Sequence, residues 1–431
     1  MILRLSSPAA RALLVLVALV FAAGLSYSSI RNARAVHFAG LDTREGYARA
    51  AQLEPGNARY WYLLGRHAQY DLQDPDARRA IQAYRNALSF DPRSADTWLN
   101  LGTAYESEGD LASARDAFLQ AKRVYPLSAE VSWRYGNFLL RRGELDPAFK
   151  EIRRAVEVDP KHAAEAFSRC FRVDPDIDAI LNRVLPPSRD AYVDVIRALT
   201  EEGQTEQALA VWSRLAALHP QLPLANSFAL VNALIQKKEM VEARRIWDQS
   251  LGFAGISPPP DPPGSLVWDG GFESGIVGGG FAWRYSQLSS GVQISLDSQE
   301  KHAGNHSIRL TFDGKKNVNL GDVCQNVAVQ PSAAYHFSAW VHTRGLTTDQ
   351  GVRFLLHSAG YSSNTSVWTK DVRGSEPWTH LEMPWTAGKD VPELQICVIR
   401  NSSEKFDSQI QGTAWVDDIT LVPESTERAK P

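Results

Sequence analysis

A 34-residue period is the feature of this sequence that most limits what it can fold into. Pro92, Pro126 and Pro160 recur at that interval, and Gly102 and Gly136 share it. Each period holds two apolar stretches at helical spacing, and the proline ends the second because proline cannot continue a helix. Units of this kind bury their apolar faces only against their neighbours, so they stack into a solenoid. The concave surface of such a solenoid is better suited to binding a partner than to catalysis.

The residues inside one period are more specific than the period itself. From residue 98 to 126 the pattern reads Trp98, Leu101, Gly102, Tyr105, Ala114, Phe118, Ala121 and Pro126. This pattern resembles the tetratricopeptide repeat. The resemblance implies an α-solenoid of helix pairs over residues 42–252, with a protein partner on its concave surface. We expect the small residues to let paired helices approach closely and the aromatic residues to fill the core.

The array has one interruption, at residues 161–190. Asp174-Pro175 and Pro186-Pro187 break the helical pattern there. We expect one degenerate helix pair at this point, with a bend in the superhelix.

A membrane segment precedes the repeats. Residues 12–30 carry no charge and lie between Arg11 and Arg31. At 1.5 Å per residue this helix is about 28 Å long, close to the hydrocarbon thickness of a bilayer. We predict a single-pass anchor within residues 1–34, with the bulk of the chain outside the cytoplasm. The alternative is a cleaved signal peptide with residues 13–23 as its apolar region. In either case the rest of the chain would be exported from the cytoplasm.

Charge and cysteine content exclude some classes of protein. The formal net charge of −3 provides no basic field for nucleic acid. Three cysteines in 431 residues are too few for a disulfide-dense scaffold. Cys324 and Cys397 fall in one domain and could form a disulfide across strands, whereas Cys170 is expected to be a buried hydrophobe.

The composition changes at a run of prolines. Helical periodicity ends near Trp247, and five prolines lie between Ser257 and Gly264. This run predicts an extended spacer over residues 253–265 that holds two domains apart. Short alternating segments follow, which predict a β-sandwich over residues 266–423 and a tail at 424–431. The fold class is therefore multidomain α plus all-β.

The expected strands are Ser307 to Phe312, Val323 to Val329, Tyr335 to Thr343, Val352 to His357, His380 to Trp385, Leu394 to Arg400 and Thr413 to Val422. Alternation in the third strand places Tyr335, Phe337, Ala339 and Val341 on its core face. The other face of that strand is available for a ligand.

An ordered set of short motifs carries a second resemblance. The motifs are Asp269 to Gly275, Gly304 to Leu310, Gln330 to Val341, Glu376 to Trp378 and Trp415 to Leu421. Together they look like the jelly-roll carbohydrate-binding modules of secreted glycosidases, within the galactose-binding-like folds. The resemblance implies carbohydrate binding and a structural calcium held by Glu273 and Asp417 where the two termini meet. The alternative is that these carboxylates accept backbone hydrogen bonds in a turn.

Sugar recognition uses aromatic faces together with a few polar groups. The aromatic candidates are Trp283, Tyr285, Trp340, Tyr361 and Trp368, and the polar candidates are His342, Arg353 and His357. Trp378, Trp385 and Trp415 are better interpreted as core residues. For each candidate, packing inside the fold is the alternative.

No catalytic motif accompanies these candidates. The sequence has no phosphate-binding loop, no His-Glu-x-x-His zinc motif and no Gly-x-Ser-x-Gly nucleophile motif. We therefore expect a non-enzymatic, membrane-anchored binding protein of the cell envelope, associated with polysaccharide assembly or export. One alternative is a protein-interaction scaffold without sugar binding. The other is a glycan hydrolase with an unrecognised site.

Overall fold

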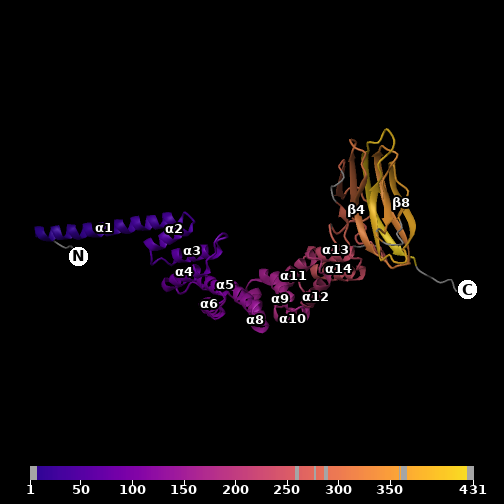
Figure 1. Cartoon of the computed structure of the whole chain (residues 1–431). Helices are drawn as coiled ribbons and strands as arrows, with labels where there is room; N and C mark the ends of the chain where they lie inside the picture. Colours follow the sequence, from indigo (N-terminus) through magenta and orange to yellow (C-terminus); the bar gives the residue numbers. More distant parts are fainter. Residues whose placement is uncertain are drawn as a thin grey trace. The chain divides into compact units, whose positions relative to one another are not determined.

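The computed structural model describes residues 7–257, 262–275, 278–285, 290–358, 360 and 366–424. The chain divides into two compact units, one ending at Pro186 and the other beginning at Pro187. Repeated helix pairs are followed by a β-sandwich (Figure 1). This confirms the predicted fold class.

The first unit is helical. Its helices are α1 (Pro8–Ala39), α2 (Arg44–Leu53), α3 (Ala58–Tyr70), α4 (Ala77–Phe90), α5 (Ala95–Ser107), α6 (Leu111–Val124), α7 (Ala129–Arg141), α8 (Leu145–Val158), the 3₁₀ turn η1 (Pro160–His162), α9 (Ala163–Val173) and α10 (Ile177–Arg183). The interruption expected at residues 161–190 contains the short pair α9 and α10.

Close approach of paired helices explains the regular spacing of small residues within the repeats. A Cβ atom on Gly102 would lie 3.1 Å from the Phe118 ring, and one on Gly136 would lie 2.7 Å from the Ile152 side chain. Phe118 is buried, as predicted, whereas Trp98 is only partly buried. The indole of Trp98 donates to the Pro92 carbonyl oxygen at 2.9 Å instead. The glycines therefore set the distance between the two helices of a pair.

Helix α1 continues from the apolar stretch into the helical packing. Residues 11–39 are long and apolar enough to cross a membrane, by length and composition. Ala35, near the end of the same helix, is fully buried and clusters with Ala50, Ala51 and Tyr60. The first helical hairpin is thus formed by α1 and α2, so the packing begins ahead of residue 42.

The second unit begins with α11 (Arg189–Glu201), α12 (Thr205–Ala217), α13 (Ala225–Gln236) and α14 (Met240–Ala254). Trp247 of α14 packs edge-on against Trp268, with ring centroids 5.5 Å apart, and against Phe281 at 6.2 Å. The Gly280 amide also donates to Asn232 of α13 at 2.9 Å. The prediction that the proline-rich segment holds two domains apart is therefore wrong. The Trp247 ring of the last hairpin packs directly against the first residues of the sandwich domain.

Two antiparallel five-stranded sheets form the sandwich, in the orders β1-β4-β9-β6-β7 and β2-β3-β10-β5-β8. The strands are β1 (Arg284–Tyr285), β2 (Val292–Asp297), β3 (Ser307–Asp313), β4 (Leu320–Ala328), β5 (Ala334–Leu346), β6 (Arg353–His357), β7 (Ser366–Trp368), β8 (Gly374–Thr386), β9 (Glu393–Arg400) and β10 (Gln411–Pro423). All seven expected strands are present, while β1, β2 and β7 were not predicted.

The core of the sandwich lies between the two sheets. Tyr335, Phe337, Ala339 and Val341 all face it and are at most 2% exposed, which confirms the predicted alternation. The outward faces of the sheets are consequently the surfaces on which a ligand site can be built.

Candidate functional site

The predicted sugar-binding residues do not gather in one place. Trp283 belongs to the core at 1% exposure, and its indole donates to the Asp269 carbonyl oxygen at 3.0 Å. Tyr285 packs against the same core from β1. We remove Trp283 from the candidate set because a ring inside the core has no free face for a sugar, and Tyr285 because its ring, though partly exposed, is turned toward that core. Tyr361 lies outside the described residues.

Trp340 and His342 lie on the outer face of the β2-β3-β10-β5-β8 sheet. The His302 ring stacks on Trp340 at 3.9 Å, and His380 covers it from 4.8 Å. His342 stacks on Trp415 at 4.9 Å. We call this surface the closed face and define it by six rings: His302, Trp340, His342, Trp378, His380 and Trp415. Its aromatic faces are largely occupied by one another.

The closed face also changes the interpretation of two tryptophans. Trp415 is only 4% exposed, but it alternates with the fully buried Ala414 and Val416, so it lies on the outer side of β10. Trp378 is half-buried and contacts His302 and His342. These two residues pack on the outside of the sheet, whereas Trp385 joins the core as predicted.

Arg353, His357 and Trp368 lie together on the outer face of the other sheet. One row of paired residues crosses all five strands there, from Arg284 through Cys324, Cys397 and Leu355 to Trp368. A second row runs from Asn326 through Gln395 and His357 to Ser366. We call this surface the open face, because Trp368 at its edge is 54% exposed.

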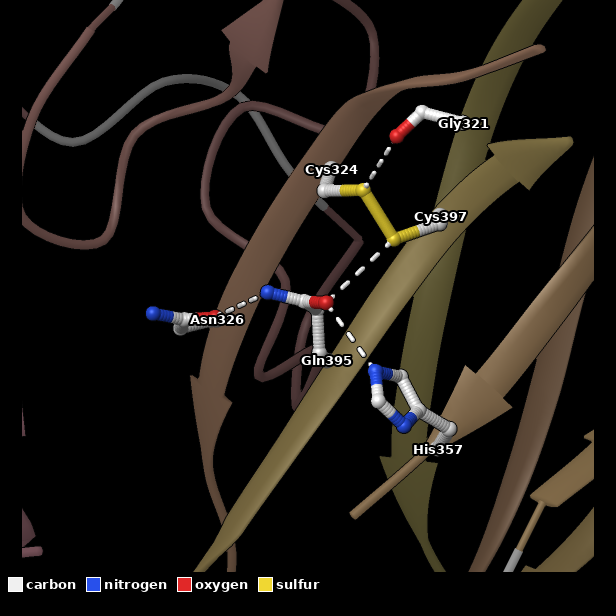
Figure 2. Close-up of a disulfide and its surroundings, with 6 residues drawn as sticks. All are labelled: Gly321, Cys324, Asn326, His357, Gln395 and Cys397. Atoms are coloured by element: carbon white, nitrogen blue, oxygen red, sulfur yellow. Dashed lines mark hydrogen bonds between the residues drawn. A yellow bond between two sulfur atoms is a disulfide. The ribbon is translucent and has the colours of Figure 1, made fainter. Parts of the chain in front are cut away.

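Hydrogen bonds order the second row of the open face. The Gln395 amide nitrogen donates to Asn326 Oδ1 at 3.0 Å, and His357 Nε2 lies 3.1 Å from Gln395 Oε1 (Figure 2). Because Oε1 accepts, this geometry assigns the Nε2 proton to His357. Nδ2 of Asn326 and Nδ1 of His357 then provide one donor group and one acceptor that no other described residue engages. His357 is the half-buried member of this row that a hydroxyl group could reach, whereas Asn326 is only 4% exposed and lies deeper.

A disulfide joins the neighbouring strands β4 and β9 in the first row, beside this polar row. Cys324 and Cys397 are directly paired between β4 and β9, and their sulfur atoms are bonded (Figure 2). Gln395 Oε1 lies 3.6 Å from Cys397 Sγ. The disulfide has no donor proton, so it forms a fixed, weakly polar part of the face beside Gln395. Cys170, in contrast, is a free buried cysteine, and burial raises the pKa of its thiol to about 12.

Charged residues close one end of the open face. Arg353 donates to Gln350 Oε1 at 2.6 Å and lies 3.7 Å from a carboxylate oxygen of Asp371. Burial acts to raise the pKa of Asp371, but hydrogen bonds from Arg373 and Gly351 and the charge of Arg353 hold it below its ordinary value. Asp371 is therefore an ionised anchor that orients two arginines.

The sequence analysis missed Asn326 and Gln395. Gln395 alternates with the buried Leu394 and Ile396, so its position on the face of Cys397 was available from the sequence. Its pairing with Asn326 was not, because the two residues are 69 positions apart. Arg284, at the end of the first row, was missed because β1 itself was not predicted.

Glu273 and Asp417 are the predicted calcium ligands. Glu273 accepts from the Asn305 and His306 amides, at 2.6 and 3.0 Å. Asp417 is fully buried and accepts from the His302 amide at 2.7 Å. Desolvation raises the pKa of Asp417 to about 6.

A cation would fit this pair only in part. Both acids flank one glycine, since a Cβ on Gly271 would lie 3.7 Å from Glu273 Cγ and 3.8 Å from Asp417 Oδ1. The described residues hold no group of three or more His, Cys, Asp or Glu side chains suited to a metal. Calcium takes six to eight oxygen ligands, so backbone carbonyls would have to complete the shell. The backbone hydrogen bonds match the alternative raised from the sequence.

Comparison with known families supports both resemblances. A family described as a carbohydrate binding domain matches residues 264–403. Families described as TPR repeat and tetratricopeptide repeat match residues 78–109 and 109–163. The chain carries tetratricopeptide repeats and a carbohydrate-binding domain. Both domains are binding types.

Two curated relatives match part of the chain. Protein bimA of Emericella nidulans is 34% identical over 83 residues, which cover 19% of this chain and 10% of that protein. The general transcriptional corepressor ssn6 of Schizosaccharomyces pombe is 28% identical over 146 residues, covering 29% of this chain and 13% of that protein. The chain thus spans about a tenth of the length of these relatives.

Solved structures resemble each part separately. TmCBM61 in complex with β-1,4-galactotriose is 20% identical with a TM-score of 0.27, and covers 37% of this chain and 99% of that one. YrrB, described as a TPR protein with an unusual peptide-binding site, is 16% identical with a TM-score of 0.26, and covers 49% of this chain and 94% of that one. At these scores neither likeness carries an argument about ligands.

Proposed function

We propose that this protein is a membrane-anchored, non-enzymatic scaffold of the cell envelope. Its sandwich binds carbohydrate on the open face, and its helical repeats dock a protein partner. Such a combination would serve the assembly or export of a surface polysaccharide. The observation that carries the proposal is the open face itself, where an exposed tryptophan flanks a hydrogen-bonded polar row.

The open face has the chemistry that sugar recognition requires. Trp368 offers a ring to the C–H surface of a pyranose, while the half-buried His357 on the neighbouring strand offers an acceptor for a hydroxyl group. Gln395 holds both polar groups in position. Because these side chains lie on paired strands, little ordering is needed when a sugar binds.

Helix α1 supports membrane anchoring. The helix runs without a break from the apolar stretch to Ala39, so a cleavage site near residue 24 would fall inside a helix. Leu13, Val17 and Phe21 are all more than half exposed, which suits a lipid environment. The disulfide supports placing the sandwich outside the cytoplasm, where disulfides persist.

Two measurements test the anchor. We expect the full-length protein to stay with membranes after alkaline carbonate extraction, and its N-terminal peptide to be found by mass spectrometry. A mature protein that begins near residue 25 would overturn the anchor and leave the sugar proposal intact.

The sugar proposal is tested with the full chain on an array of microbial polysaccharides. A detergent without a sugar headgroup avoids competition for the face. We expect Trp368→Ala to weaken binding to any positive glycan at least tenfold, because stacking on one ring contributes about 1.5 kcal/mol or more. Trp340→Ala is the matched control, since it removes a tryptophan from the closed face, and it should leave affinity within twofold.

Three outcomes would contradict this proposal. An array without binding favours a protein-interaction scaffold. Equal losses for both tryptophan variants would place the site elsewhere. Release of reducing sugar from a bound glycan would favour the hydrolase.

A further inference from the structure

A ladder of polar side chains joins the first helices of three successive hairpins, α3, α5 and α7. The Asn100 amide of α5 donates to the Tyr62 hydroxyl of α3 at 3.3 Å. Arg134 of α7 donates to Asn100 Oδ1 at 3.1 Å and to Thr103 Oγ1 at 2.7 Å. The ladder continues to α9, where Arg169 donates to Asn137 Oδ1 at 2.9 Å. One helix surface of the first unit is therefore polar and ordered.

Two adjoining hollows lie along this ladder, and Arg134 lines both of them. The first hollow is lined by Tyr62, Arg66, Tyr70, Asp96, Asn100 and Arg134. The second is lined by Thr103, Phe118, Trp133, Arg134, Asn137, Arg141 and Arg169. We call the two together the arginine groove.

Charge in the arginine groove is unbalanced. Four guanidinium groups line it against one carboxylate, that of Asp96. The carboxylates of Glu106 and Glu165 pair with Arg141 and Arg169 at 2.8 and 2.5 Å, but neither acid lines the groove. Two of the four cations are therefore paired, and the positive charge of the groove rests mainly on Arg66 and Arg134.

Arg134 is the central cation, and neutral oxygens hold it. Its hydrogen bonds go to the side chains of Asn100 and Thr103 and to the Leu99 carbonyl oxygen. Its only ion-pair contact among the described residues is Glu130 at 3.9 Å. A half-buried guanidinium held by neutral acceptors keeps its charge available for an anion.

The aromatic rings of the groove are less available than its charges. The Trp133 ring is stacked by His162 at 4.8 Å and covered by the Arg169 guanidinium at 5.3 Å. Arg66 lies 5.9 Å from the Tyr62 ring centroid. Sugar binding depends on free ring faces, so the groove suits an extended chain of carboxylates better than a glycan.

We propose that the arginine groove binds an acidic, extended segment of a protein partner through Arg134 and its neighbouring arginines. This inference rests on the proposed docking of a protein by the repeats, and it names the chemistry of the docked segment. Charge-assisted hydrogen bonds to carboxylates provide the affinity, so binding weakens as salt rises.

The test uses the full chain in detergent micelles and a fluorescein-labelled peptide of eight alternating Asp and Ser residues. The control peptide has Asn in place of each Asp. Fluorescence anisotropy at 50 mM and 300 mM NaCl should show binding of the acidic peptide alone, with affinity at least fivefold lower at the higher salt.

Three variants locate the site. Arg134→Gln should weaken acidic-peptide binding at least tenfold. Arg66→Gln should weaken it about threefold, and this side chain is exposed, so the substitution leaves the helix packing in place. Arg123→Gln is the matched control, because it removes the same charge from an exposed position on α6 outside the groove. It should leave affinity within 1.5-fold. Circular dichroism verifies that each variant is folded.

Several results would overturn the proposal. These are equal binding of the Asp and Asn peptides, binding that is unchanged by both Arg134→Gln and Arg66→Gln, or no binding of the acidic peptide at low salt. Binding of a polygalacturonate oligomer in the groove without binding of the acidic peptide would replace the protein segment by an acidic glycan. Binding of the Asn peptide in the groove would overturn the acidic preference while leaving protein docking by the repeats intact.

Glycan binding by the sandwich, measured on the same samples, should not change in any of the three variants.

Discussion

The two outer faces of the sandwich carry similar residues but are built differently. Each contains tryptophan, histidine and arginine on alternating positions of its strands. On the closed face, His302 and His380 cover Trp340, and Trp378 and Trp415 flank His342. On the open face, Trp368 stands exposed at the edge strand, and the described residues place no ring against it. Residue type therefore does not tell a binding surface from a packing surface.

What separates the faces is the length of the side chains on neighbouring strands. Rings on adjacent strands β5, β8 and β10 of the closed face pack against one another. The central strands of the open face present Cys324, Cys397 and Gln395, which are short or linear, and so leave a ring at the edge uncovered. The following predictions test this contrast, from the largest expected effect to the smallest.

The disulfide should contribute most to the stability of the open face. Replacing both cysteines, Cys324→Ala with Cys397→Ala, should lower the free energy of unfolding by about 3 kcal/mol, since the crosslink restricts the unfolded chain. Urea denaturation followed by tryptophan fluorescence measures this loss. A reducing agent should destabilise the wild type and leave the double variant unchanged. No effect of reductant on the wild type would show that the bond does not form.

Calcium should act beside the closed face, through Asp417. At a hundredfold excess over its Kd, a bound ion adds about 2.7 kcal/mol to the free energy of unfolding. Thermal unfolding with calcium and with a chelator should therefore differ in the wild type and coincide in Asp417→Asn. Glu382→Gln, an exposed acid on β8, is the control and should keep the difference. Identical wild-type curves with and without calcium would mean that the backbone amides alone satisfy both acids.

Trp340→Ala should destabilise the fold without affecting glycan binding. The variant removes a ring held between two histidines, at an expected cost of about 2 kcal/mol. Chemical denaturation measures this effect, with Trp368→Ala as the comparison, because an exposed ring contributes about 0.5 kcal/mol or less. A larger destabilisation by Trp368→Ala would reverse our assignment of the two faces.

Gln395→Leu should weaken glycan binding about fivefold, because Asn326 and His357 lose the partner that positions them. That ratio corresponds to about 1 kcal/mol. Calorimetric titration of a glycan identified on the array measures it, and Thr379→Val, on the opposite sheet, is the control. Unchanged affinity would remove the polar row from the site.

The smallest effect concerns acid pH. Because the folded state lowers the pKa of Asp371, its contribution to stability is present above the unfolded pKa, near 4, and is lost as pH falls through the lower folded value. The expected loss is of the order of 1 kcal/mol, measured by urea midpoints at pH 5 and below pH 4. Asp371→Asn should flatten this dependence. An equal slope in the variant would assign it to other carboxyl groups.

Prediction from the sequence succeeded where contacts are local. Gly102 and Gly136 were assigned to helix crossings because each helix packs on the next one along the chain. Strands with clear alternation, such as β5 and β9, were also found. The short strands β1 and β7 were not, since two or three residues carry no periodic signal. Docking of Trp247 on Trp268 was missed as well, because a proline run indicates extended backbone and says nothing about the surfaces on either side.

The order of parts, the helical period, the apolar span and the core faces of the longer strands were all determined by the sequence alone. These properties depend on residues within one or two turns or strands of each other, so their pattern is visible in the chain. Only the tertiary structure decided that Trp283 is buried, that Trp340 is covered, and that Trp368 shares an outer face with a polar row built from three strands. Exposure of a side chain depends on neighbours that are distant in sequence, and the pairing of strands alone brings those neighbours together.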